Sequence, residues 1–132
     1  MGATPWSYFV AYESDVEAAL EKLRTRVFES GEYQGSEMNP ASPEEAVANM
    51  EADGTASILD MMSVSDSPGM CSICPLRSDK LESLFGTTQP TREMIEANLD
   101  YYEDIDRGEG IYIVAYRDGK PSEYFFAGYS FD

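Results

Sequence analysis

The chain has 132 residues, a length typical of one domain, so we expect a single unit over residues 1–132. Its 25 acidic and 9 basic residues give a net charge of −16, which argues against nucleic acid and anionic membranes as ligands. No apolar run approaches the roughly 18 residues of a membrane span, and no signal-like leader opens the chain. A cytoplasmic protein is therefore expected.

The first third of the chain predicts a strand followed by a helix. Residues 6–12 are rich in aromatic and β-branched side chains, which favours a strand. Beyond them the apolar spacing becomes helical, with Ser14 as the expected N-cap and Gly31 as the left-handed end. Residues 32–41 show no periodicity and predict a surface loop.

The middle of the chain predicts a short helix and a strand. Ser42 and Pro43 form a typical helix start, and Gly54 is the expected end of that helix. Residues 55–64 (TASILDMMSV) are predicted to form a strand, and residues 65–75 to be irregular.

Two further helices are predicted before the C-terminal region. Ser78 is the expected cap of a short helix over residues 79–85, which Gly86 ends. Residues 90–105 carry an apolar stripe at helical spacing and predict the longest helix of the chain. Gly108 and Gly110 then lead into the last predicted element.

Residues 110–132 predict a β-hairpin, because two apolar runs flank Asp118 and Gly119, a pair typical of two-residue turns. If the two strands pair without a bulge around that turn, the cross-strand residue pairs are determined. These are Ile111 with Phe126, Ile113 with Tyr124, Tyr112 with Phe125, and Val114 with Glu123.

The predicted order is β-α-α-β-α-α-β-β. Few strands with helices grouped between them indicate an α+β fold. We expect a mainly antiparallel sheet of about four strands with helices packed on it, ending in the C-terminal hairpin. Both hairpin faces are largely apolar, so the second face is either covered or left for a partner.

Four segments carry a resemblance to known proteins: GATPWSYFVAY, TASILDM, PTREMIEANLDYY and RGEGIYIVAYRDGKPSEYFFAGYSFD. Through them, nearly the whole chain resembles a family of small uncharacterised bacterial proteins. The resemblance implies no catalytic residues.

Cys71 and Cys74 form a CxxC motif with three interpretations. A redox dithiol needs a stabilised thiolate, but Arg77 and Lys80 are the only cations nearby, and the acidic surroundings predict raised thiol pKa values. Half of a zinc site would need completion by a second copy, since the chain has no histidine and no further cysteine. Ordinary loop cysteines are the third interpretation.

A group of carboxylates lies at the end of the predicted long helix: Asp100, Glu103, Asp104, Asp106 and Glu109. A calcium loop of the EF-hand type starting at Asp104 fails, because its sixth and twelfth positions are Glu109 and Ala115. We therefore expect no metal here. The group is either a solvated face or a docking patch for a basic partner.

Aromatic residues are the second candidate binding feature. Tyr112, Tyr116 and Tyr129 are expected to share one hairpin face, either as core or as a protein-binding surface. Catalytic machinery is sparse: without histidine, Ser-His and Cys-His schemes are excluded, and no phosphate-binding loop occurs. No cofactor is expected.

These observations favour an acidic protein-binding module, immunity-like or inhibitor-like, that neutralises a basic and possibly nuclease-like protein. The main support is the absence of any basic residue from position 27 to position 76. One alternative is a thiol-dependent redox or small-molecule enzyme using Cys71 and Cys74, and another is an accessory subunit of a larger assembly. Acidic adaptation to a salty cytoplasm would also produce this charge without any partner.

Overall fold

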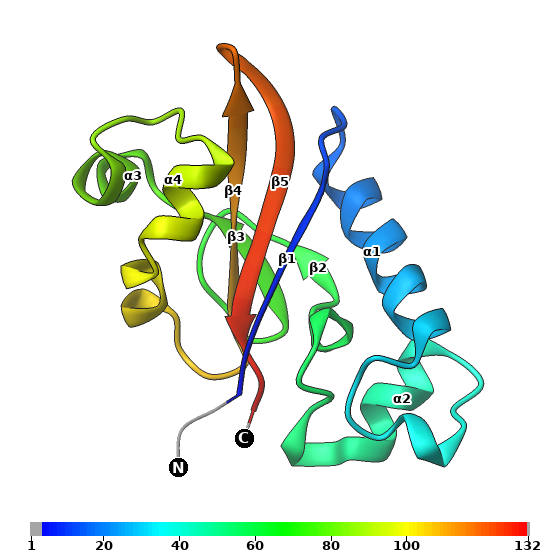
Figure 1. Ribbon diagram of the computed structural model, residues 1–132. Coiled ribbons are helices and arrows are strands. Elements are labelled where there is room, and N and C mark those ends of the chain that lie inside the picture. The colour runs from blue at the N-terminus through cyan, green and yellow to red at the C-terminus, as the bar shows by residue number, and fades with distance from the viewer. Residues whose placement is uncertain (1–3, 132) are drawn as a thin grey trace.

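The computed structural model describes residues 4–131, apart from the side chains of Ala52, Tyr101 and Asp104. Its centre is a five-stranded mixed sheet in the order β1-β5-β4-β3-β2 (Figure 1). The strands are β1 (Pro5–Ala11), β2 (Ser63–Val64), β3 (Ser72–Pro75), β4 (Gly110–Arg117) and β5 (Lys120–Tyr129). The helices are α1 (Val16–Ser30), α2 (Pro43–Met50), α3 (Ser78–Phe85) and α4 (Arg92–Ala97). Short 3₁₀ turns are η1 (Ser36–Met38), η2 (Glu51–Asp53), η3 (Ile58–Asp60) and η4 (Asp100–Asp104).

The sheet confirms the α+β class but corrects its details. Strand β5 is antiparallel to both β1 and β4, as expected, whereas β4, β3 and β2 run parallel to one another. The predicted four-stranded, mainly antiparallel sheet therefore lacks one strand and both parallel pairs. Parallel neighbours depend on contacts between distant segments, which local sequence patterns do not reveal.

The predicted strand over residues 55–64 was largely wrong. Only Ser63–Val64 is a strand, and Ile58–Asp60 forms η3 instead. The cause is local hydrogen bonding: the Ser57 hydroxyl accepts from the Leu59 N–H, and Asp60 accepts from the Thr55 N–H, so side chains compete with the extended backbone. The predicted irregular segment 65–75 in turn contains strand β3.

The predicted long helix over residues 90–105 ends early. Helix α4 stops at Ala97, because the Asn98 side chain accepts from the Asp100 N–H and donates to the Leu84 carbonyl. After this break the chain forms only η4. The longest helix of the described residues is α1.

Two helix starts differ from the predicted ones by a single residue, and one agrees. The N-cap of α1 is Asp15, which accepts from the Glu17 N–H, and not Ser14. Helix α3 includes Ser78, with Arg77 at its N-cap. At α2 the predicted start is confirmed, since the Ser42 hydroxyl accepts from the Glu45 N–H. That helix ends at Met50, and Gly54 instead ends the following turn η2.

The C-terminal hairpin is confirmed, but its register is not the predicted one. Asp118 and Gly119 form the turn with φ of 54° and 78°. A β-bulge between Ala115 and Tyr116 then shifts every later pair by one residue. The observed pairs are Ile111 with Ala127, Tyr112 with Phe126, Ile113 with Phe125, and Val114 with Tyr124.

Both faces of the sheet are covered (Figure 1). On one face, side chains of α1, α2 and η3 pack against strand residues that include Ile73 and Phe126. On the other, Ile95 of α4, Ile105 after η4 and half-buried residues of α3 pack against Ile113 and Phe125. The second hairpin face, which the sequence left open, is therefore part of a core.

Trp6 of β1 lies in a slot made by two glycines. Gly110 and Gly128 are paired across β4 and β5, and Trp6 pairs with Gly128 on its other side. A Cβ atom on Gly128 would lie 2.5 Å from Trp6 Cζ2, so only glycine leaves room for the indole. The slot buries Trp6 to 5% exposure.

Candidate functional site

Residues 29–53 form a projection beside α1, which we call the acidic lobe. It contains the end of α1, then η1, α2 and η2, and lies at the α2 end of the molecule in Figure 1. The Gln34 N–H joins the lobe to the body by donating to the Thr55 carbonyl at 2.8 Å, and within the lobe Met50 packs on Gly35. Gly35 has φ of 95°, a left-handed conformation that favours glycine, and a Cβ atom there would also displace the Met50 side chain.

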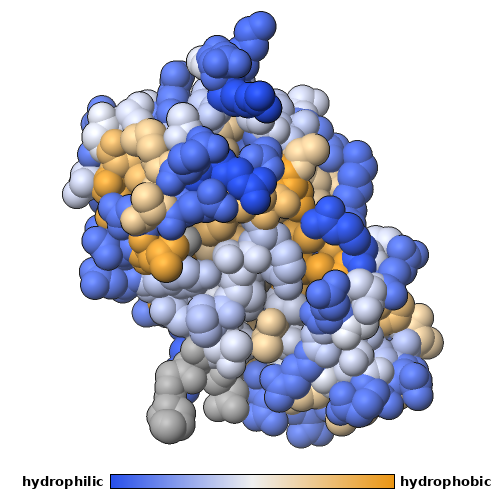
Figure 2. Space-filling model, in the orientation of Figure 1, coloured by the Kyte–Doolittle hydropathy of each residue, from blue (hydrophilic) through white to orange (hydrophobic). Residues whose placement is uncertain are grey.

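The acidic lobe concentrates exposed carboxylates, and Figure 2 shows its visible surface as mainly hydrophilic. The chain has no lysine or arginine between Arg26 and Arg77, so no basic residue lies within the lobe. Seven acidic residues are exposed there: Glu29, Glu32, Glu37, Glu44, Glu45, Glu51 and Asp53. Among the described residues, one ion pair reaches this set, from Glu44 to Arg24 at 3.7 Å.

Arg24 ties the acidic lobe to the core. Its side chain is 4% exposed, and its Nη2 donates to the Leu59 carbonyl of η3 at 3.1 Å. Its Nη1 lies 3.4 Å from Glu21 and 3.7 Å from Glu44. Because this guanidinium is buried and already engaged, it leaves most of the lobe's negative charge uncompensated. The seven carboxylates consequently repel one another and present a negative field to solvent.

The acidic group predicted at residues 100–106 lies elsewhere, in and just after η4. Asp100, Glu103 and Asp106 are exposed there, while the side chain of Asp104 lies outside the described residues. Residues beside η4 pack on the sheet face opposite to α1. The fold therefore carries a second, smaller acidic surface.

The three predicted binding tyrosines do not share a face. Tyr112 is half-buried on the α1 face, with its ring 6.4 Å from that of Phe126. Tyr129 is half-buried on the opposite face, 5.3 Å from the ring of Tyr102 in η4. Tyr116 lies near the hairpin turn, where its N–H donates to the Pro90 carbonyl at 2.8 Å. Only Tyr129 is thus placed close to the η4 carboxylates.

The two cysteines are free thiols in different surroundings. Cys71 is half-buried in the loop before β3, and Cys74 is buried within β3. Burial raises the pKa of both thiols; the charge of Asp60 adds to this at Cys71, and that of Glu109 at Cys74. This is the predicted direction, and it disfavours the thiolate that redox chemistry requires.

A hollow of about 560 Å³ adjoins Cys74 and is lined also by Arg77 and Lys80. These two cations do not reverse the raised pKa of the Cys74 thiol. Within residues 4–131, no cluster of three histidine, cysteine or acidic side chains has the arrangement of a metal site.

Asp60 is a buried acid that lies within the predicted strand over residues 55–64. Its Oδ1 accepts from the Thr55 N–H at 2.8 Å and from the Thr55 hydroxyl at 2.9 Å, while Oδ2 has no partner within the described residues. Burial is the main cause that raises the pKa of this carboxyl. The polar spacing of Thr55, Ser57 and Asp60 was the signal for a local turn of this kind.

The fold defines an α+β protein with a five-stranded mixed sheet covered on both faces. No protein-family model matches the chain, and comparison with curated proteins and with solved structures gives no match either. Within residues 4–131, every helix is too short or too polar to cross a membrane.

Proposed function

We propose that this protein is an acidic protein-binding module, immunity-like or inhibitor-like, that neutralises a basic protein partner. The observation that carries the proposal is the acidic lobe, where seven exposed carboxylates stand on one projection without an intervening basic residue. Such a field speeds encounter with a positively charged surface and favours its bound orientation.

The partner class follows from this charge. A basic protein would relieve the repulsion among the lobe carboxylates, whereas nucleic acid would increase it. Nuclease-like partners fit well, because their substrate sites are positive and a row of carboxylates would occupy the place of phosphates. The η4 carboxylates with Tyr129 offer a second contact surface for the same kind of partner.

The test begins with the intact protein immobilised at low salt, exposed to extract of its native host, and followed by identification of the retained proteins. We expect a basic protein whose association slows steeply as salt is added, because salt screens exposed charges. If no basic protein is retained at low salt, the proposal is wrong.

Two variants of equal net charge then locate the contact. One carries Glu29→Gln, Glu37→Gln and Asp53→Asn in the acidic lobe, and the control carries Glu17→Gln, Glu82→Gln and Glu93→Gln elsewhere. All six side chains are exposed, and each variant loses three negative charges. We expect the lobe variant to associate about tenfold more slowly than the control at low salt, as close opposite charges govern association rates. Equal rates for the two variants would rule out the lobe as the contact.

A further inference from the structure

The two edges of the sheet differ in how well they are protected. The β2 edge is two residues long, whereas β1 extends over seven residues from Pro5 to Ala11. The pairing of β1 with β5 is regular, without a bulge, and β1 carries no charged side chain. Proteins usually protect an edge strand with charges, bulges or shortness. Among the described residues of β1, Pro5 at the start of the strand is the one feature that protects this edge from pairing.

The hydrogen-bond pattern shows which backbone groups of β1 are free. The Tyr12 N–H donates to the Ser122 carbonyl at 3.1 Å, and the Ser130 N–H donates to the Thr4 carbonyl at 2.9 Å. In an antiparallel ladder alternate residues bond to the partner, so the even-numbered residues of β1 face β5. Ser7, Phe9 and Ala11 therefore direct their N–H and C=O groups outward. Within residues 4–131 no other backbone group bonds to them.

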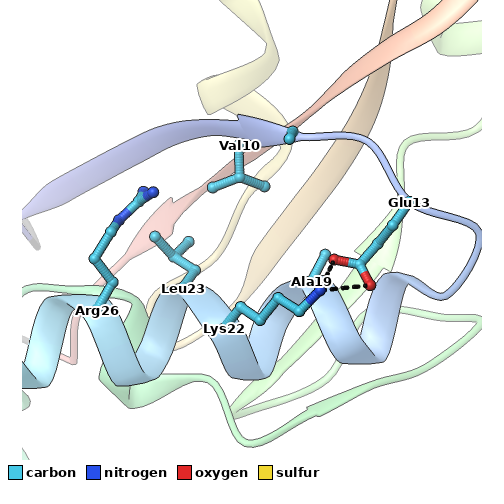
Figure 3. Close-up of a pocket in the computed structure, with 7 residues that line it drawn as sticks. Val10, Glu13, Ala19, Lys22, Leu23 and Arg26 are labelled. Carbon is cyan, nitrogen blue, oxygen red and sulfur yellow. Dashed lines mark hydrogen bonds and ion pairs between the residues drawn. The ribbon is translucent and has the colours of Figure 1, made fainter.

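A groove runs beside this edge, between β1 and α1 (Figure 3). It begins with a hollow of about 290 Å³, whose apolar walls include Val10 and Leu23. A second hollow of about 360 Å³ continues past Tyr8 and Val27. Arg26 lines both hollows, so they are parts of one surface, which we call the edge groove.

Arg26 gives the edge groove a positive centre. In Figure 3 its side chain rises from α1 toward β1, where its charge acts on the half-buried Tyr8 hydroxyl. Within the described residues it forms no ion pair with a carboxylate. The neighbouring Lys22, by contrast, is paired with Glu13 at 3.0 Å. An unpaired exposed arginine in a chain of net charge −16 is available for a carboxylate brought by a ligand.

We propose that the edge groove binds an extended peptide segment, which adds to β1 as a sixth strand and places one carboxylate at Arg26. The outward groups of Ser7, Phe9 and Ala11 would supply the backbone hydrogen bonds, and the two hollows would take alternate apolar side chains. A second copy of this chain is a poor occupant, because two molecules of net charge −16 repel each other. A highly acidic peptide is disfavoured for the same reason.

This site is distinct from the proposed contact with a basic protein. Of the lobe carboxylates, only Glu32 borders the edge groove. The test uses the intact protein and a displayed library of random heptapeptides with free carboxyl termini. We expect enrichment of peptides that alternate β-branched or aromatic residues with polar ones and carry a single carboxylate. No enrichment, or enrichment of lysine-rich peptides, overturns the proposal.

Matched variants then measure binding of the most enriched peptide, labelled with fluorescein. Ser7→Pro removes an outward N–H without removing a hydrogen bond to β5, while Ser7→Ala keeps that N–H at the same exposed position. We expect the proline variant to bind at least about fivefold more weakly than the alanine variant. Arg26→Gln should weaken binding about tenfold, and Arg26→Lys should restore part of it.

Three results overturn the edge groove as the site. One is equal affinity of the two Ser7 variants, provided that their urea unfolding midpoints agree within a few tenths molar. Another is peptide-induced NMR shifts that avoid the amides of Ser7, Phe9 and Ala11. The last is a dimer without peptide, seen by light scattering, whose dilution-dependent NMR shifts fall on those same amides, since a second copy would then occupy the edge.

Discussion

The C-terminal hairpin and the acidic lobe differ in what their side chains contribute: the hairpin buries apolar side chains, whereas the lobe exposes like charges. The hairpin strands β4 and β5 bury apolar side chains on both faces, and Phe126 and Ala127 are 0% exposed. The lobe has one buried apolar side chain, Ala46, among its described residues, and every one of its carboxylates is exposed. Burial stabilises the hairpin, whereas like charges destabilise the lobe. The difference indicates that the hairpin supports the fold and that the lobe adds little to its stability, which agrees with the proposed use of the lobe as a contact surface.

This comparison predicts a large effect at the hairpin. Phe126→Ala removes a fully buried ring from the core on the α1 face. We expect the free energy of unfolding to fall by about 3–5 kcal/mol, because the side chain loses its burial and leaves a cavity. The measurement is urea unfolding followed by circular dichroism.

The control for that variant comes from the lobe. Met38→Ala changes a side chain that is 53% exposed in η1, and it should alter the free energy of unfolding by less than about 0.5 kcal/mol. Comparable losses at the two positions would contradict the conclusion that the hairpin, and not the lobe, supports the fold.

A smaller effect of opposite sign is expected at Glu51, at the end of α2. Its backbone has φ of 51° and ψ of −124°, a region that glycine tolerates and other residues occupy only with strain. Glu51→Gly should raise the free energy of unfolding by about 1 kcal/mol, because relief of strain exceeds the entropy cost of glycine. Glu51→Gln removes the same charge without relieving the strain. If the two variants gain equally, charge rather than backbone strain is the cause.

The smallest effect is a pH dependence at Asp60, where the lobe meets the sheet. Burial raises the pKa of this carboxyl above its usual 3.8, so the folded protein binds the proton more tightly than the unfolded chain does. Its contribution to stability is therefore complete below the unfolded pKa and is lost as pH rises through the folded pKa.

Asp60→Asn tests this sign, because the amide keeps an acceptor for Thr55 and does not titrate. Unfolding free energies of both proteins should be measured from pH 4 to pH 7. The stability of wild type relative to the variant should decline across that range, by less than about 1.4 kcal/mol for each unit of pKa shift. A relative stability that increases with pH would show that the hydrogen bonds from Thr55, with the charge of Arg24, outweigh burial.

The sequence predicted best where structure is local. The Asp118-Gly119 turn, the Ser42 cap and the Gly31 helix end depend on neighbouring residues, and each was confirmed. The bulge at Ala115 was not predictable, since it adds one unpaired residue to β5 outside the turn, where no turn preference marks it. Asn98 likewise ends α4 through a bond to Leu84, a contact made only by the folded chain.

The acidic composition of the candidate site could be predicted from the sequence, but its three-dimensional arrangement could not. The interval without basic residues from Arg26 to Arg77 was visible in the sequence, but the sequence did not show that its first part forms one projection. The separation of Tyr112 from Tyr129 follows from the bulge. The predicted pairing of Tyr112 with Phe125 would place both tyrosines on one face, whereas the observed pairing with Phe126 turns Tyr129 to the other face, because a shift of one residue reverses the facing of a strand. The edge groove depends on which strand ends the sheet, and that is a property of the topology alone.

The position of β5 has a consequence for biosynthesis. Ser7 of β1 pairs with Ala127 of β5, so the first strand waits about 120 residues for its partner to leave the ribosome. Until then β1 exposes two unpaired edges, and pairing of such distant segments is intrinsically slow. The carboxylates emerge during that interval, and their mutual repulsion would discourage unfinished chains from associating through β1. The repulsion that destabilises the folded lobe would thus reduce aggregation of the chain before it folds.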